Sequence, residues 1–177
     1  MFKRLSYIFG SKTKAQEIVM LLNNLKPVVR QGFYESELVK VNKYCSENGL
    51  FLVKSRFKVL LDAEGLDEER KMSLIYSNKG LRIPEDDQRA GMFFVYISKN
   101  EEKAYLASYY ELVGNDSDLG LLLGYPKCCT EFFCNKFSAK NTNLELDAVN
   151  AFTNLSKRDE DCVILSHFPC NPSLTVR

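Results

Sequence analysis

The chain has 177 residues, of which 45% are hydrophobic and 27% are charged, and its formal net charge is +1. A chain of this length fits one domain that buries roughly two thirds of its unfolded surface. The composition is that of a globular protein and excludes an intrinsically disordered one. The near-neutral charge provides no field that would attract nucleic acid or an anionic membrane, so neither is indicated as a partner.

Apolar periodicity and turn residues predict helices at both ends of the chain and extended segments between them. In chain order, we expect helices at 15–25 and 35–47, strands at 50–61, 71–76 and 92–98, helices at 101–113, 118–123 and 126–137, a helix at 143–155 and a strand at 162–165. The predicted fold class is α+β, a single domain over 1–177 with a small, mainly antiparallel sheet flanked by several helices. Its parts are a helical segment 1–49, a strand-rich segment 50–100 and a helical segment 101–177 that carries the Cys/His motif described below.

Two local features accompany these elements. Basic side chains cluster at Lys3–Arg4 with Lys12–Lys14, and again at Lys54, Arg56 and Lys58, and both clusters are interpreted as solvated faces. The segment 77–91 is predicted to be a long polar loop, and loops of this length are often functional. Its cations Lys79, Arg82 and Arg89 would suit an anionic substrate.

The expected cellular compartment follows from two kinds of segment, a transmembrane helix and a secretory signal. No run of about eighteen apolar residues is present, so no transmembrane helix is expected. The start, MFKRLSYIFGSK, has too short an apolar part to be a secretory signal. The expected location is therefore the cytoplasm, where six cysteines are thiols or metal ligands in preference to disulfides.

Reactive side chains are concentrated in two segments, LGLLLGYPKCCTEFFCNKF at 119–137 and SHFPC at 166–170. Together they hold four of the six cysteines and the only histidine, His167. Pro126 fits the first turn of a helix, which puts Cys128 and Cys129 at a helix N-terminus, where free N–H groups and the helix dipole stabilise a thiolate. These two cysteines are about 100° apart around the axis and can reach one object.

The other cysteines are assigned different roles. Cys134 lies more than a helical turn beyond Cys129 and is interpreted as a structural thiol. Cys45 and Cys162 are predicted to be packed in the interior. Cys170 stands after a predicted strand in the spacing H-x-x-C, and the ends of core strands are common places for binding residues.

GYPKCC with the following Phe132–Phe133, and HFPC about forty residues later, resemble an uncharacterised prokaryotic family, largely archaeal, with the signature G-Y-P-x-C-C…H-x-P-C. The resemblance covers about 119–170. It implies a shared cysteine/histidine site and no particular reaction. The family tail continues as H-x-P-C-x-x-x-C, which would place a cysteine where this chain has Leu174, so a ligand is replaced or the tail is shortened.

Three functions fit this site. Cys128, Cys129, His167 and Cys170 match a tetrahedral zinc centre in number and softness of ligands, and an iron–sulfur cluster is the alternative cofactor. The same residues suit a thiol enzyme, with a cysteine nucleophile at the helix N-terminus and His167 as acid or base. The third option is a non-catalytic structural or interaction module. The expected partner is a small molecule or a protein.

Overall fold

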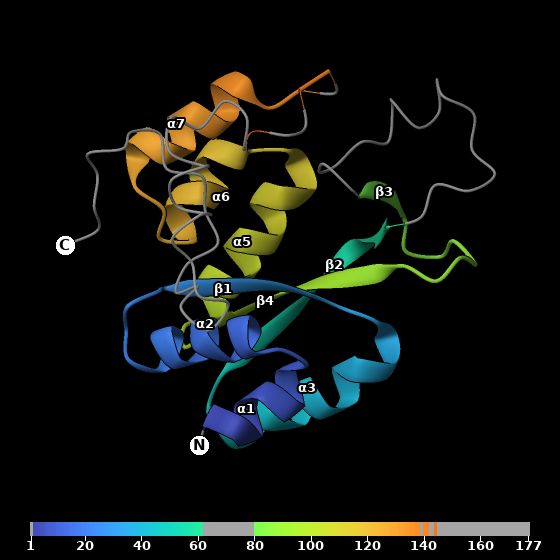
Figure 1. Ribbon diagram of the computed structural model, residues 1–177, viewed down its shortest axis with the longest axis vertical. Helices are drawn as coiled ribbons and strands as arrows, with labels where there is room; N and C mark the ends of the chain where they lie inside the picture. The colour runs from blue at the N-terminus through green and yellow to red at the C-terminus, as the bar shows by residue number, and fades with distance from the viewer. Residues whose placement is uncertain (1, 62–79, 139, 142–143, 145–177) are drawn as a thin grey trace, which may run out of the picture.

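The computed structural model describes residues 2–61, 80–138, 140–141 and 144. At its centre is a four-stranded sheet in the order β1-β4-β2-β3, with every neighbouring pair antiparallel (Figure 1). The strands are β1 (Val28–Phe33), β2 (Phe51–Leu60), β3 (Leu81–Pro84) and β4 (Met92–Ser98). The predicted α+β class, with a small antiparallel sheet in one domain, is confirmed.

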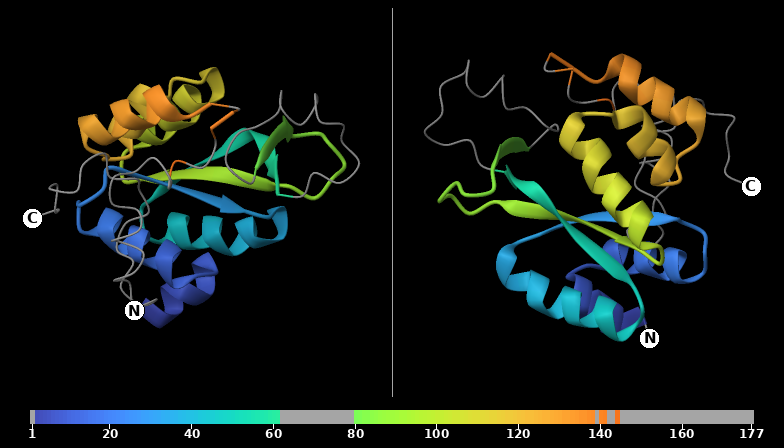
Figure 2. Two further views of the ribbon diagram at one scale, coloured as in Figure 1. Left: turned by 45° about the horizontal axis from the view of Figure 1, so that its top comes forward. Right: turned by 180° about the vertical axis from the view of Figure 1, so that it is seen from behind.

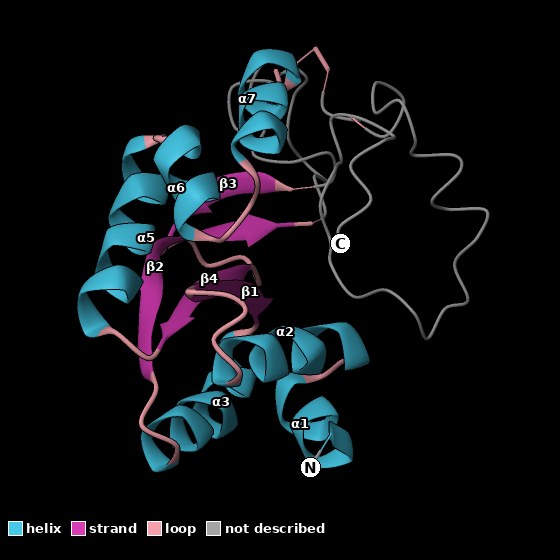
Figure 3. Ribbon diagram, turned by 90° about the vertical axis from the view of Figure 1, so that its left-hand side faces the viewer, coloured by secondary structure: helices cyan, strands magenta, loops and turns pink. Residues whose placement is uncertain are grey.

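Helices cover both faces of this sheet (Figures 1 and 3). One layer contains α1 (Phe2–Phe9), α2 (Lys12–Leu22) and α3 (Glu35–Glu47), and the other contains α5 (Glu101–Val113), α6 (Asp116–Leu122) and α7 (Lys127–Lys136). The two views of Figure 2 show the N-terminal helices on one side of the strands and the α5–α7 layer on the other. Within the described residues, no helix is both long and apolar enough to cross a membrane.

Strand β4 explains why both faces are covered. Its sequence MFFVYIS is almost continuously apolar, as expected for a central strand buried on both sides. Successive side chains point to opposite faces, so Val95 and Ile97 join the core beneath α1–α3 while Tyr96 joins the core beneath α5 and α6. The strand is hydrogen-bonded to β1 on one side and β2 on the other.

Several elements lie where the sequence predicts them, because their ends are set by local signals. The bounds of α3, β4 and α5 match the expected ones, and α5 is capped by Asn100, which accepts from Lys103 N, and ends at Gly114 with φ of 73°. Helix α6 begins two residues earlier than expected, at Asp116, because Asn115 caps it in place of Ser117 or Asp118. Helix α2 also starts earlier, at Lys12, because Ser11 accepts from Lys14 N.

Three described elements were not predicted. The segment 2–9 is helical, β1 follows directly after Pro27, and β3 occupies part of the segment 77–91 that was expected to be a loop. Both strands lie at the edges of the sheet and are short, so their pairing partners, distant in sequence, define them. The predicted strands 71–76 and 162–165 and most of the predicted helix 143–155 lie outside the described residues.

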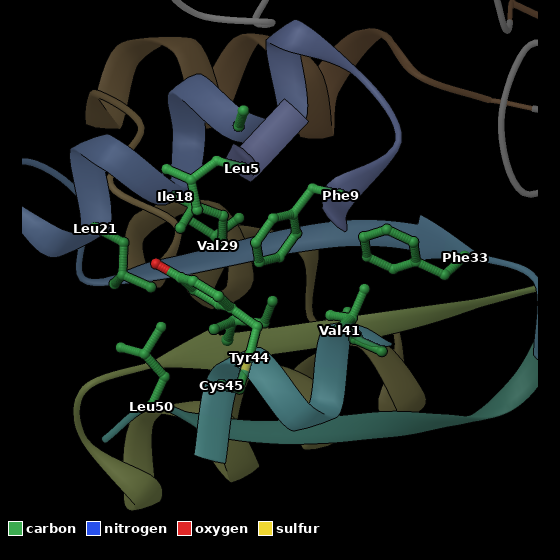
Figure 4. Close-up of a cluster of buried hydrophobic side chains, with 13 residues drawn as sticks. Leu5, Phe9, Ile18, Leu21, Val29, Phe33, Val41, Tyr44, Cys45 and Leu50 are labelled. Atoms are coloured by element: carbon green, nitrogen blue, oxygen red, sulfur yellow. The ribbon is translucent and has the colours of Figure 1, made fainter. Parts of the chain in front are cut away.

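The larger apolar core joins α1–α3 to the sheet (Figure 4). Phe9 is fully buried at its centre, with its ring 5.4 Å from that of Tyr44 in an edge-on arrangement and 6.2 Å from that of Phe33. Cys45 is buried in the same cluster, as predicted, and desolvation raises the pKa of its thiol to about 12. The thiol of Cys45 is therefore an unreactive packing group.

Replacing Phe9 tests this core. Phe9→Ala should lower the free energy of unfolding by about 3–5 kcal/mol, because it removes a buried ring and leaves a cavity. Phe2→Ala on the same helix, where the side chain is 37% exposed, should cost less than about 1 kcal/mol. Urea denaturation followed by circular dichroism measures both, and equal losses would contradict the packing of α1.

Candidate functional site at the start of helix α7

The GYP part of the motif forms the turn between α6 and α7. Gly124 has φ of 85°, in the left-handed region that favours glycine, and a Cβ added there would lie 3.2 Å from Pro27 Cδ. Tyr125 follows with its ring centroid 5.3 Å from Lys26 Nζ. The turn therefore rests against the Lys26–Pro27 segment that leads into β1.

The sequence placed Pro126 in the first turn of the helix. In the structure Pro126 is the N-cap of α7, one position before the first helical residue. Its carbonyl oxygen accepts hydrogen bonds from Cys129 N and Thr130 N, each at 3.0 Å. Helical residues begin at Lys127, so Cys128 and Cys129 both lie in the first turn, as predicted. Pro126 and the contact of Tyr125 with Lys26 thus set the position of the first helical turn, which carries Cys128 and Cys129.

A close contact between α6 and α7 fixes the direction of the helix. A Cβ at Gly120 of α6 would lie 2.7 Å from Thr130 Cγ2, so only glycine allows this approach without a shift. Next to it, Leu119 and Leu123 are buried in the second core with Tyr96 and Ala107. Helix α6 therefore packs on the sheet through Leu119 and Leu123, and α7 packs on α6 through the contact between Thr130 and Gly120.

The two adjacent cysteines have different environments. Cys128 is exposed, whereas Cys129 is only 5% exposed. Cys134, interpreted from the sequence as a structural thiol, is also exposed, so burial does not account for it. Partial desolvation and the neighbouring Asp116 carboxylate raise the pKa of Cys134, which disfavours its thiolate. The helix therefore carries one exposed thiol at its N-terminus and another near its C-terminus.

The remaining predicted ligands, His167 and Cys170, lie outside the described residues, as does Cys162. Among the residues that are described, no group of three or more His, Cys, Asp or Glu side chains is placed to hold a metal ion. Cys128 and Cys129 therefore provide at most two ligands from the described part of the chain. The structure brings these two together and gives no placement for the other two.

The basic loop expected at 77–91 has a different role in its described part. Arg82 belongs to β3 and donates to the carbonyl oxygens of Glu111 (3.3 Å) and Leu112 (3.1 Å) at the end of α5. Arg89 makes a two-pronged ion pair with Asp87, at 2.8 and 2.9 Å. Both guanidinium groups thus bond to the protein itself, and Lys79 lies outside the described residues, so the anion-binding role stays a prediction.

A polar cluster under α5 was not anticipated. Glu111 is 2% exposed, accepts a hydrogen bond from Tyr96 Oη, and forms an ion pair with Arg30 Nη1 at 2.9 Å. Burial raises the pKa of the Glu111 carboxyl to about 7; Arg30 opposes the shift and Asp116 reinforces it. The sequence does contain a signal, because Ala104, Ala107 and Glu111 share the helix face that meets the sheet.

Comparisons of the chain with protein-family models, with curated proteins and with solved structures found no match. The structure itself shows an α+β protein whose antiparallel sheet lies between two helical layers, with two adjacent cysteines in the first turn of α7.

Replacing Gly120 tests the seating of α7. Gly120→Ala would gain about 1 kcal/mol in helix propensity, but the clash with Thr130 should outweigh the gain and lower the free energy of unfolding by about 1–3 kcal/mol. Adding Thr130→Ala removes the clashing atoms, so the double variant should be at least as stable as Thr130→Ala alone. Urea denaturation of the four proteins in this cycle measures the coupling. A Gly120→Ala protein more stable than the parent would contradict the contact.

The Glu111 cluster predicts an unusual dependence of stability on pH. Because the folded pKa of about 7 exceeds the ordinary value of 4.5, the folded state retains the proton longer than the unfolded state does. This group therefore makes stability fall as pH rises from about 4.5 to about 7, with no further change above that. In Glu111→Gln that component should vanish, as seen in urea denaturation across this range.

The matched control is Glu102→Gln, which removes an exposed carboxylate from the same helix. It should retain the decline of the parent protein. If the difference in unfolding free energy between the parent and Glu111→Gln stays constant with pH, Glu111 has an ordinary pKa and the expectation fails.

Proposed function

We propose that this protein binds a metal ion, zinc in the first instance, through Cys128, Cys129, His167 and Cys170. The observation that supports the proposal most directly is that Cys128 and Cys129 share the first turn of α7. Adjacent cysteines in one helical turn can supply two sulfur ligands to one metal ion. Three sulfur ligands and one imidazole complete a tetrahedral set for zinc, and the same ligands suit an iron–sulfur cluster.

The environment of the turn adds to this. The Gly124–Pro126 segment is anchored on Lys26 and Pro27, and Gly120 locks α7 against α6, so the two thiols are held in place before any ligand arrives. Ligands held by packing reduce the ordering cost of binding. Because Cys128 is exposed, a metal ion bound to its sulfur can be reached by ligands from another segment of the chain. The proposal assigns that segment to His167 and Cys170.

The role of such a centre depends on how many positions the protein fills. Four protein ligands close a zinc site and make it structural, in keeping with an interaction module. Three protein ligands and a water leave a position open, and zinc then lowers the pKa of the bound water or polarises a substrate carbonyl. The resemblance noted in the sequence implies the ligand set but neither outcome.

A second candidate is favoured by the unequal exposure of the two cysteines. An exposed Cys128 at a helix N-terminus, beside a buried Cys129, has the accessibility that a nucleophile needs. In this alternative His167 is the acid or base, and the backbone N–H groups of the turn bind a developing anion. The third alternative is a module in which the thiols have no chemical role.

The deciding experiment is elemental analysis of protein purified without oxygen, together with its absorption spectrum. We expect about one zinc per chain, lost in Cys128→Ser and in Cys129→Ser and also in Cys170→Ser, with a lower Tm after chelation because metal binding adds to folding free energy. Iron with broad visible absorption would replace zinc by a cluster within the same site.

Cys134→Ser is the matched control, because Cys134 is an exposed thiol on the same helix. It should leave the metal content unchanged. A metal-free protein whose Cys128 alkylates much faster than Cys134 at neutral pH would contradict the metal centre and favour the nucleophile. A metal-free protein in which the two thiols react at the same slow rate would leave the non-catalytic module.

A further inference from the structure

The fold separates charges that cancel over the whole chain. Residues 2–61, which form α1–α3, β1 and β2, contain 11 Lys and Arg against 4 Asp and Glu, a formal charge of +7. Residues 80–141, which form the opposite helical layer with β3 and β4, contain 7 against 9. The net charge of +1 therefore conceals an excess of cations in this part of the chain. Of these cations, Arg30 pairs with Glu111 of the opposite layer and Lys26 pairs with Glu17, whereas those of α1, α2 and α3 belong to the helical layer on one face of the sheet (Figures 1 and 2).

The basic side chains of this layer are close to one another. Lys40 of α3 donates from Nζ to the carbonyl oxygen of Tyr7 on α1 at 3.4 Å, and its ammonium lies 5.6 Å from the Tyr7 ring centroid. Desolvation lowers the pKa of Lys14 on α2, and Lys40 lowers it further, against the opposing effect of Glu37. Lys14 of α2 and Lys40 of α3 therefore lie close enough to interact, and Lys40 contacts α1, the helix that carries Lys3 and Arg4.

The carboxylates of the same surface offset these charges only in part, since α1–α3 contain six Lys and Arg against Glu17, Glu35, Glu37 and Glu47. Glu37 Oε2 accepts a hydrogen bond from Tyr34 N, and Glu47 Oε1 lies 3.9 Å from Lys43 Nζ in a solvent-exposed pair. Exposed pairs of that kind are weak and screened by salt. On α1, Lys3 and Arg4 are exposed, and no acidic residue is present in that helix.

Two cations of this part of the chain lie over aromatic rings of the sheet that are themselves buried, Phe33 at 0% and Phe93 at 2% exposed. Lys14 Nζ lies 3.9 Å from the ring centroid of Phe33, Phe33 is paired with Phe93 across β1 and β4, and Lys54 Nζ lies 4.0 Å from the ring centroid of Phe93. The row of cations therefore continues from the helices onto β2. Tyr7, with 79% of its surface exposed, presents an uncovered ring beside Lys40.

We propose that this basic face, made by α1, α3 and the adjoining cations of α2 and β2, binds single-stranded nucleic acid. Cations that follow a phosphate backbone, together with exposed aromatic rings on which bases stack, are the combination that single-strand-binding surfaces use. Lys3, Arg4 and Lys40 contact phosphates, and Tyr7 stacks on a base. This surface lies in a different helical layer from the proposed metal centre and does not depend on it.

An anionic membrane would also attract these charges, but the geometry of α1 disfavours it. A helix that inserts into a bilayer surface needs a free apolar side. In α1 that side, Leu5 and Phe9, is 1% and 0% exposed because it is packed into the core. What α1 presents to solvent is Lys3, Arg4 and Tyr7, with Phe2 at its first position 37% exposed.

The test is fluorescence anisotropy of the full chain with a labelled single-stranded oligonucleotide of about 16 nucleotides, the upper end of known site sizes for one binding fold. Affinity is measured at several salt concentrations. Removing two phosphate contacts with Arg4→Gln/Lys40→Gln should reduce the slope of log K against log salt by about 1.4. Tyr7→Ala should weaken binding about tenfold and leave that slope unchanged, because stacking releases no counterions.

The matched control is Lys103→Gln/Lys136→Gln, which removes two exposed cations from the opposite layer. It should leave affinity and slope unchanged. Absence of binding at low salt, equal losses in the control, or no effect of Tyr7→Ala would overturn the proposal. Binding to phosphatidylserine vesicles with no affinity for the oligonucleotide would also overturn it and assign the face to a membrane.

Discussion

The burial of strand β4 on both faces is the constraint on which the described structure depends. The strand pairs with β1 and β2, so its backbone groups are satisfied within the sheet. Its side chains then require an apolar cover on each side, which α1–α3 and the α5–α6 layer provide. The two helical layers are positioned by their packing against the side chains of β4.

The site at the start of α7 is a consequence of the second cover. Leu119 and Leu123 pack with Tyr96, which holds α6 on the sheet, and the turn after α6 then meets Lys26–Pro27. The glycines and the proline of the motif are accounted for by this geometry alone. Packing accounts for Cys129, which is buried, whereas burial does not account for the exposed Cys128.

The two helical layers also differ in their electrostatics. The α5 layer contains a buried carboxylate, Glu111, held between Arg30 and Tyr96, whereas the α1–α3 layer places its cations at the surface. A buried charge pair of this kind is costly to desolvate and specifies how the helix sits more than it stabilises it.

The sequence by itself determined the elements whose signals are local. The bounds of α3, β4 and α5 follow from caps, turn residues and apolar periodicity, and so does the placing of Cys128 and Cys129 in one helical turn. The tertiary structure alone decided what depends on contacts between distant positions. The edge strands β1 and β3 are defined by their partners, Arg30 meets Glu111 across 81 positions, and Lys14 of α2 comes close to Lys40 of α3. Local patterns report the conformation of the backbone, but burial, charge pairing and surface potential are sums over neighbours that only the folded chain brings together.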